Sequence, residues 1–287
     1  MTCPVCGSGR SRLRHRVRGY DYLSCGRCGA TRVKPFPTSE EAARWYQIEN
    51  YFKHEDKDAG YRNYLSLQVE IQKTFTRRNW LLRRHFDLSG KDVLEIGCGP
   101  GLYPATLRPF AIRSYLGLDL NPYAVDSLRQ RGFEGFVGRV EELDAESRFD
   151  IAVFFDVFEH ILDPNTFFAA LVRMLRPGGL VFFTTPSTHS LLARVSGRRW
   201  VSYIAPQHVI LHNETSLRWI LDKYGFKILE MKWDRQWVDL PFLLDRLTDL
   251  FLGSRGASVF SKLFGGRGPG VSVANGMRIV VAGRRAS

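Results

Sequence analysis

The stretch VLEIGCGPG at residues 93–101 is the strongest indication of the fold in this sequence. A short apolar run leads into three glycines at alternate positions, Gly97, Gly99 and Gly101. The run predicts a buried strand over residues 92–96. Glycine can take backbone angles that other residues rarely adopt, and it lets a ligand approach the main chain. We therefore expect a ligand-binding turn at the carboxyl end of this strand.

The turn differs from a dinucleotide site. Its third glycine comes one position earlier than in the G-x-G-x-x-G fingerprint, and Pro100 lacks an N–H that a pyrophosphate could use. Glu95, just before the turn, favours a cationic ligand. Asp119 ends the next strand-like run, where a carboxylate can accept hydrogen bonds from the ribose hydroxyls. A positively charged nucleoside without a pyrophosphate fits these features, and S-adenosylmethionine (SAM) is such a molecule.

From residue 92 onward, strand-like and helix-like runs alternate along the chain. The strand-like runs cover residues 92–96, 114–119, 133–137, 149–155, 180–185, 226–233 and 276–283. The alternation predicts an α/β fold, Rossmann-like and doubly wound, with helices on both faces of a mostly parallel sheet. One helix is expected to start at an Asp163 cap, with Pro164 in its first turn, and to end at Gly178 and Gly179.

Four of the five cysteines form two pairs with metal-site spacing. Two residues separate Cys3 from Cys6 and Cys25 from Cys28, and 18 residues lie between the pairs. This spacing is typical of a structural zinc site with four thiolate ligands, which leave no open position for catalysis. Disulfides are the alternative. They are disfavoured by a cytoplasmic location, which we expect because the start of the chain lacks a signal-peptide core.

Composition and charge narrow the class of protein. The chain has 287 residues, is 44% hydrophobic and 24% charged, and carries a net charge of +12. These values are ordinary for a globular protein, and no apolar run approaches the roughly 20 residues that span a bilayer. The positive charge favours an anionic partner (RNA, a membrane surface or an acidic metabolite), or else reflects only a well-solvated basic surface.

Three units are expected along the chain. They are a zinc-binding module at 1–37, a helical lid region at 38–89 and a main domain at 90–287 with insertions near 187–215 and 238–270. The lid region opens on a capping-box pattern of Thr38 and Glu41. The aromatic residues Tyr46 and Tyr51 follow, and they either pack in the core or close over a ligand. The 238–270 insertion is basic and amphipathic, so it can pack on the core, cover a lipid-like acceptor or lie on an anionic membrane.

Several motifs together resemble the class I SAM-dependent methyltransferases. They are E-x-G-x-G-x-G, the aspartate that ends the second strand, FDIAVFFDVFEHILDP at 149–164 and LRPGGLVFFTTP at 175–186. The resemblance is strongest to the branch that includes ubiquinone-biosynthesis methyltransferases and many methyltransferases of sugars, lipids and natural products. It covers residues 90–235 and a last strand near 277–284. It implies a seven-stranded sheet whose final strand is reversed.

The resemblance also implies a SAM site. The acid and glycines of the turn would hold the methionine part, Asp119 would hold the ribose, and the end of the fourth strand would face the sulfonium. The implied SAM contacts are Glu95, Gly97, Gly99, Gly101, Asp119, Leu120, Val140, Glu141, Phe155 and Asp156, with Tyr46 and Tyr51 as a lid and Arg78 at the SAM carboxylate.

The acceptor site is expected after the fifth strand, within RRWVSYIAPQHVILHNETSL at 198–217. His208 is the candidate general base or acceptor ligand, and His160 in FEHIL is a second catalytic candidate. Trp200 and Tyr203 would line the same pocket. For both histidines the alternative is a buried, hydrogen-bonded side chain.

Three functions compete at this point. The leading one is a SAM-dependent methyltransferase acting on a small-molecule or lipid-linked acceptor: a sugar, a quinone-like ring or a natural product. The second is an rRNA or tRNA methyltransferase that binds RNA through the basic zinc module. The third is a non-catalytic binding protein with the same fold. The sequence does not identify the acceptor, the atom methylated or the oligomeric state.

Overall fold

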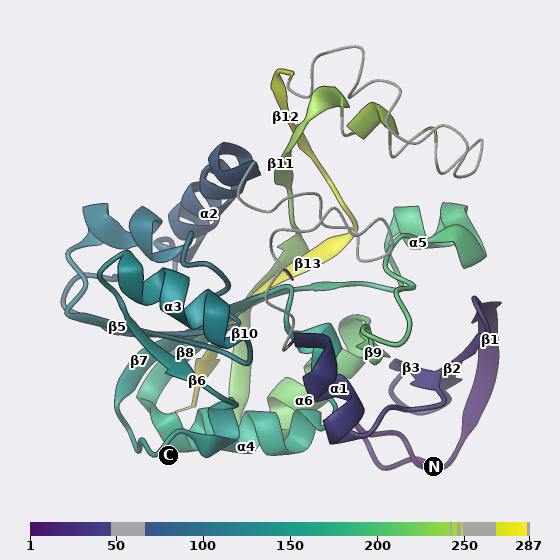
Figure 1. Cartoon of the computed structure of the whole chain (residues 1–287). Coiled ribbons are helices and arrows are strands. Elements are labelled where there is room, and N and C mark those ends of the chain that lie inside the picture. Colours follow the sequence, from purple (N-terminus) through teal and green to yellow (C-terminus); the bar gives the residue numbers. More distant parts are fainter. Residues whose placement is uncertain (47–66, 242, 246–247, 249–267, 286–287) are drawn as a thin grey trace.

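The computed structural model describes residues 1–46, 67–241, 243–245, 248 and 268–285 (Figure 1). Its centre is a seven-stranded sheet in the order β10-β13-β8-β7-β4-β5-β6. The strands are β4 (Asp92–Ile96), β5 (Ser114–Asp119), β6 (Glu134–Val137), β7 (Phe149–Phe155), β8 (Leu175–Pro186), β10 (Phe226–Trp233) and β13 (Met277–Arg284). Parallel pairing joins β4 to β5 and β7, whereas β13 runs antiparallel to both β8 and β10. The predicted α/β fold and its reversed last strand are confirmed.

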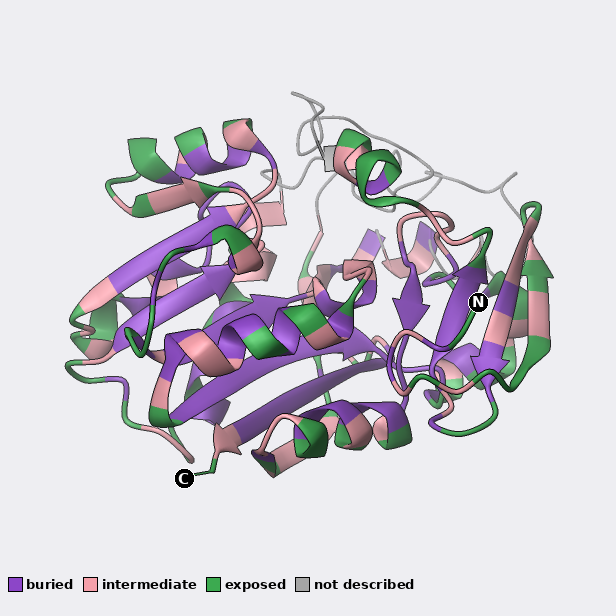
Figure 2. Ribbon diagram, turned by 90° about the horizontal axis from the view of Figure 1, so that it is seen from below, coloured by how far each residue is buried: buried purple, intermediate pink, exposed green. Residues whose placement is uncertain are grey.

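Helices cover both faces of the sheet, and each face has its own apolar cluster. One face carries α2 (Gln68–Leu82), the 3-10 helix η2 (Pro104–Phe110) and α3 (Pro122–Gln130). The other carries α4 (Pro164–Met174) and α6 (Glu214–Lys223). Figure 2 shows the resulting layers, with buried strands beneath helices whose outer sides are exposed. Strands buried on both faces read as continuous apolar runs, as in the FDIAVFF of β7.

The helix α4 starts as predicted but ends earlier. The Asp163 carboxylate accepts hydrogen bonds from the backbone N–H of Asn165 and Thr166, as an N-cap does. The predicted end at Gly178 and Gly179 is wrong, because α4 stops at Met174 and these glycines lie within β8. The register between β7 and β8 is irregular here, which absorbs the extra residues before regular pairing starts.

The N-terminal module is joined to the main domain by a shared sheet. Its strands β1 (Ser11–Val17), β2 (Tyr20–Cys25) and β3 (Thr31–Lys34) pair in order, and β3 then pairs with β9 (Ile210–Leu211) of the main domain. The helix α1 (Ser39–Tyr46) follows, and Thr38 and Glu41 bond reciprocally across its start as the capping box predicts. The four-cysteine module therefore packs directly on the segment predicted to form the acceptor site (Figure 1).

The remaining elements are short. They are α5 (Leu191–Ser196), the 3-10 helices η3 (Val140–Glu142), η4 (Phe158–His160) and η5 (Gly197–Arg199), and the two-stranded sheet of β11 (Gln236–Asp239) and β12 (Gly270–Val273). Most of the basic amphipathic 238–270 insertion lies outside the described residues. Among the described helices, none has the length and apolar character needed to cross a membrane.

Candidate active site and metal centre

The glycine turn lies at the carboxyl end of β4, next to β7, where the strand order reverses. In open α/β sheets this switch point is where ligands bind. Gly97, Gly99 and Gly101 have φ angles of 71°, 51° and 79°, which side-chain-bearing residues rarely adopt. A Cβ on Gly97 would lie 2.4 Å from a Val157 methyl, and one on Gly101 would lie 3.1 Å from the Cα of Leu128. At both outer positions a Cβ would therefore collide with the protein's own packing.

The turn and the acid after β5 form one hydrogen-bonded unit. The backbone N–H of Gly99 donates to Oδ2 of Asp119 over 2.9 Å, and the N–H of Asn121 donates to Oδ1 over 2.9 Å. Burial raises the pKa of Asp119, and these backbone donors oppose the rise. Each carboxylate oxygen can accept a further hydrogen bond, so Asp119 retains acceptor capacity for the hydroxyls of a ligand.

Glu95 is buried under this turn and has a partner that sequence reasoning missed. Its side chain is 3% exposed, and the hydroxyl of Tyr115 donates to its Oε2. Burial raises the pKa of Glu95 well above its usual range, and the nearby Asp119 adds to the rise. Because Tyr115 is on the neighbouring strand β5, only strand pairing could have revealed this contact.

Asp156 closes the other side of the switch point, at the end of β7. Its φ of 59° is unusual for a residue other than glycine. Thr184 on β8 holds it, because the hydroxyl donates to Oδ1 over 2.6 Å while the Asp156 N–H donates to the hydroxyl oxygen. Such strained, over-determined residues cluster at functional sites.

Phe155, the neighbour of this acid, faces the α2 side of the sheet. Its ring packs on Phe75, Tyr103 and Phe182, with centroid distances between 5.1 and 5.3 Å. The guanidinium of Arg78 lies 4.8 Å from the same ring centroid. Phe155 is thus part of the apolar cluster on this face as well as a candidate cofactor contact.

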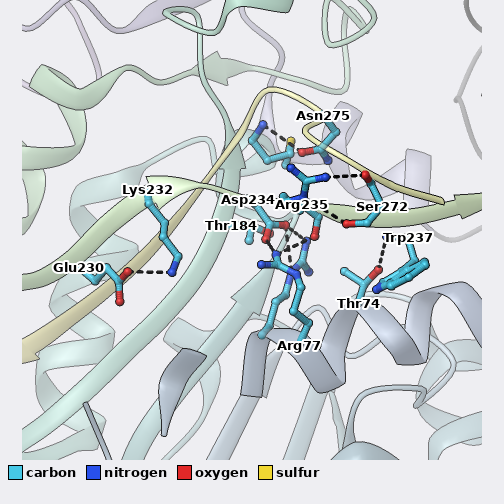
Figure 3. A network of polar contacts seen from close by, with 12 residues as sticks. Thr74, Arg77, Thr184, Glu230, Lys232, Asp234, Arg235, Trp237, Ser272 and Asn275 are labelled. Atoms are coloured by element: carbon cyan, nitrogen blue, oxygen red, sulfur yellow. Dashed lines mark hydrogen bonds and ion pairs between the residues drawn. The ribbon is translucent and has the colours of Figure 1, made fainter. Parts of the chain in front are cut away.

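Arg78 is almost fully buried and already has a carboxylate partner. Its Nη2 and Nε donate to Asp234 Oδ2 over 2.6 and 3.1 Å. The neighbouring Arg77 also donates to Asp234, and Figure 3 shows how this acid ties α2 to the end of β10. Any ligand carboxylate at Arg78 would have to share the guanidinium with Asp234. No sequence pattern marked Asp234, which lies far along the chain from α2.

The other candidate cofactor contacts are spread around the same edge. Val140 is buried and starts η3, while Leu120 and Glu141 are partly buried. Burial raises the pKa of Glu141. Tyr46 is the last residue of α1, and Tyr51 lies outside the described residues, so the lid stays a prediction.

The two catalytic candidates, His160 and His208, lie side by side although 48 positions separate them in the chain. Their ring centroids are 4.8 Å apart, and Glu159 offers a third ligand atom within 4.8 Å of theirs. The Nδ1 atoms lie 3.1 and 2.8 Å from the carbonyl oxygens of Gln207 and Ser202, respectively. Because a carbonyl only accepts, each Nδ1 carries a proton and each Nε2 presents a lone pair.

Burial keeps both imidazoles neutral. Burial lowers the pKa of His160 to about 4. Burial, and the repulsion that a protonated His160 would add, lower the pKa of His208 to about 3. Glu159 is 1% exposed, accepts a hydrogen bond from Thr185, and has a raised pKa because of burial. The two imidazoles therefore resist protonation, whereas Glu159 holds a proton more readily. The donor atoms of all three side chains also match those that bind divalent cations.

The predicted acceptor residues Trp200 and Tyr203 pack against the four-cysteine module. Both are buried, and their ring centroids are 5.2 Å apart. Tyr203 also contacts Tyr22 of β2 at 4.4 Å and His15 of β1 at 5.4 Å. The module therefore supplies one wall of this region, which sequence reasoning did not anticipate.

The four cysteines Cys3, Cys6, Cys25 and Cys28 gather at one point. Their sulfur atoms all lie within 4.8 Å of one another, with Cys3–Cys28 at 3.7 Å and Cys6–Cys25 at 3.5 Å. All four thiols are free, so the alternative prediction of disulfides is not borne out. Four sulfurs bound to zinc at about 2.3 Å would be roughly 3.8 Å apart, so the cluster fits a tetrahedral site.

A seven-stranded sheet with this strand order and a reversed last strand defines a class I methyltransferase fold. The chain belongs to the methyltransferase domain family, whose model matches residues 69–231. It is 30% identical over 181 residues to a ubiquinone biosynthesis O-methyltransferase of Aromatoleum aromaticum, covering 59% of this chain and 69% of that protein.

A relative of the same name in Pseudomonas fluorescens is also 30% identical, over 142 residues. That match covers 46% of this chain and 60% of the relative's length. Among solved structures, an S-adenosylmethionine-dependent methyltransferase from Mesorhizobium loti superposes with a TM-score of 0.51 and 16% identity, over 74% of this chain and 100% of that one. At that identity the likeness shows the fold alone.

Proposed function

We propose that the chain is a SAM-dependent methyltransferase that acts on a small-molecule or lipid-linked acceptor. The observation that carries this proposal is the unit formed by Gly99 and Asp119 at the switch point of the sheet. Family membership supports the reaction class, and the ubiquinone O-methyltransferase relatives favour a small acceptor.

The proposed cofactor site uses the residues around this unit. Asp119 would accept hydrogen bonds from the ribose, Glu95 would offset the positive charge, and Asp156 would lie at the methionine end. When bound, SAM supplies an electrophilic methyl group. The chain's task is then to hold the acceptor atom in line with that methyl group and to exclude water.

The histidine pair would handle the acceptor proton. The acceptor atom bonds to the methyl carbon, the bond from that carbon to sulfur breaks, and an acceptor O–H or N–H must lose its proton. The Nε2 of His208 is the proposed acceptor of this proton, because a backbone carbonyl holds Nδ1 in the protonated form. Burial lowers the pKa of this imidazole to about 3, so it would take the proton only as the new methyl bond makes the acceptor O–H or N–H strongly acidic. His160 would orient His208 through their edge-to-face contact.

A structural zinc ion is the second part of the proposal. The cluster of four free thiols supports it, because their sulfur atoms all lie within 4.8 Å of one another. With all four ligands supplied by the protein, zinc would hold the β1–β3 module in place and take no part in the chemistry.

One observation favours RNA as an alternative acceptor. The edge strand β1 and its flanks expose Arg10, Arg12, Arg16 and Arg18, and basic edges of this kind suit phosphate backbones. The test is transfer of radiolabelled methyl from SAM into an extract of cells lacking this protein, followed by separation into RNA, protein, lipid and small-molecule fractions. Label in the lipid or small-molecule fraction supports the proposal, and label in RNA supports the alternative. No label in any fraction, although the protein binds SAM, would contradict both.

A further inference from the structure

Arg14 joins the four-cysteine module to the predicted acceptor region. It lies on β1, and its Nη2 donates to the carbonyl oxygen of Thr188 over 3.0 Å. Its charge and a hydrogen bond also act on Tyr203, where they oppose the rise in pKa that burial causes. Thr188 lies two residues beyond the end of β8, at the carboxyl edge of the main sheet. The arginine thus reaches from one unit into the other.

Among the described residues, Arg14 has no carboxylate partner. Two other arginines that enter the interior have one, since Arg78 meets Asp234 and Arg278 meets Glu214, whereas the buried Arg32 bonds to the carbonyl oxygen of Met1. The Nε of Arg14 is buried and has no acceptor in the described part of the chain. A partly buried guanidinium without a counter-ion is costly, so this arrangement suits a site that is completed by an anion.

The two segments that meet at Arg14 contain no acid that could supply the missing charge. Residues 1–20 and residues 187–213 are free of aspartate and glutamate, whereas the second segment contributes Arg194, Arg198 and Arg199. The pKa of the exposed His189 shows the effect of the surrounding positive charges. Partial burial lowers its pKa, and Arg14, Arg278 and Arg194 lower it further.

Neighbouring side chains offer unused hydrogen-bond donors. Across the described residues, the buried Thr188 hydroxyl and Trp200 indole N–H have no partner, and the buried Tyr22 hydroxyl has only the Ala205 backbone as one. Tyr22 and Trp200 both contact Tyr203, which itself interacts with Arg14. Donors combined with a guanidinium match the oxygen atoms of a phosphate or carboxylate.

We propose that the acceptor carries an anionic oxygen group, phosphate or carboxylate, that binds between Arg14 and the segment from Thr188 to Tyr203. This inference rests on the proposed function, because it deepens the identity of the acceptor. The anionic group anchors the acceptor at the module, and the atom to be methylated lies toward the histidine pair. The module thereby contributes the substrate-binding residue Arg14 in addition to its packing against the acceptor region.

The test uses the full-length, zinc-loaded protein and two probes, inorganic phosphate and acetate, at constant ionic strength. Calorimetry measures the affinity of each probe, and NMR of the imidazoles follows His189. We expect saturable binding of at least one probe and a rise in the pKa of His189, because the anion offsets the surrounding guanidinium groups. Replacing Arg14→Gln should weaken binding by roughly tenfold or more, which is the usual worth of a charge-assisted hydrogen bond.

Arg12→Gln is the matched control, because Arg12 lies on the same strand, is exposed and undergoes the same loss of charge. It should change the affinity by less than about twofold, since screened surface charges contribute little. If Arg14→Gln disturbs folding, Arg14→Lys replaces it and should retain most of the affinity. No saturable binding of either probe, or equal losses in the Arg14 and Arg12 variants, would overturn the inference.

A SAM titration of the same samples separates this inference from the proposed function. SAM binding without anion binding contradicts the anionic acceptor alone. Anion binding lost in Arg14→Gln without SAM binding to the wild type contradicts the methyltransferase proposal and leaves an anion site.

Discussion

The cofactor half and the acceptor half of this molecule are built in different ways. The candidate cofactor site is local in sequence, because Glu95, Gly99 and Asp119 come from two neighbouring strands within 25 positions. The acceptor region gathers His160, His208 and strands β1 and β2 from segments far apart in the chain. The first half can therefore form without the N-terminal module, whereas the second depends on it.

Loss of the metal site should have the largest effect, because it should disrupt the acceptor half while leaving the cofactor half intact. Cys25→Ser removes one of the four proposed zinc ligands, and structural zinc typically contributes about 10–16 kcal/mol of apparent binding energy to such modules. We expect loss of bound zinc, faster amide exchange at Ile210 and Leu211, and loss of acceptor methylation, with SAM affinity kept. Metal analysis, hydrogen exchange and calorimetry measure these outcomes, with Ser11→Ala, at an exposed position of β1 in the same module, as the control. Equal loss of SAM affinity would show that the halves are not separable.

The histidine pair tests the chemistry of the acceptor half. His208→Gln should lower kcat/KM by about 10²–10⁴, the usual contribution of general acid–base catalysis, while SAM affinity stays constant. His85→Gln, a partly exposed histidine paired with Glu230, is the control and should leave the rate unchanged. Retention of full activity in His208→Gln would remove this side chain from the mechanism.

The stability of the cofactor half can be tested through the buried ion pair between Arg78 of α2 and Asp234. Asp234→Ala removes the buried carboxylate that accepts two hydrogen bonds from Arg78, which should lower the free energy of unfolding by about 3–5 kcal/mol. Asp21→Ala removes only the exposed pair with Arg16 and should have a much smaller effect on unfolding. Denaturant unfolding compares the two variants. Similar small losses would mean that the buried pair contributes little.

Acid should destabilise the acceptor half. Burial lowers the pKa of His160 to about 4 and the pKa values of His208 and His212 to about 3. Below about pH 6.5 the unfolded chain protonates these histidines while the folded chain does not, so stability falls by about 1.4 kcal/mol per pH unit for each one. The loss should continue down to about pH 4. Buried acids with raised pKa values, among them Glu95, Asp119 and Glu159, oppose this trend, so the histidine contribution is read as a difference between variants. From pH 7 to pH 4, the free energy of unfolding of His212→Asn should fall less steeply than that of the wild type.

Substitution of Gly101 should give the smallest effect, a loss in the free energy of unfolding that shows whether packing at the turn requires glycine. Gly101→Ala places a Cβ 3.1 Å from the Cα of Leu128 at a φ of 79°, whereas Gly90→Ala has a similar φ of 67° and open space around it. The Gly90 variant should lose about 1 kcal/mol from backbone strain, and the Gly101 variant should lose about 1–3 kcal/mol more from overpacking. Equal losses would show that packing against Leu128 does not require glycine.

The same contrast explains what could be predicted from the sequence. The alternating runs, the glycine turn and the cysteine spacing are local patterns, and the sheet and the cysteine cluster follow from them. The contacts of Tyr115 with Glu95 and of Asp234 with Arg78 depend on tertiary pairing, which leaves no local signal. The pairing of β3 with β9 was missed for the same reason, because a two-residue strand has no period to detect.

The proposed cofactor site can be tested by titrating SAM into the full-length protein and following the binding by calorimetry. We expect one saturable site in the wild type, no detectable binding in Asp119→Ala, and unchanged binding in Asp126→Ala, which alters an exposed acid on the nearby helix α3. Absence of SAM binding in the wild type, or unchanged affinity in Asp119→Ala, would contradict it.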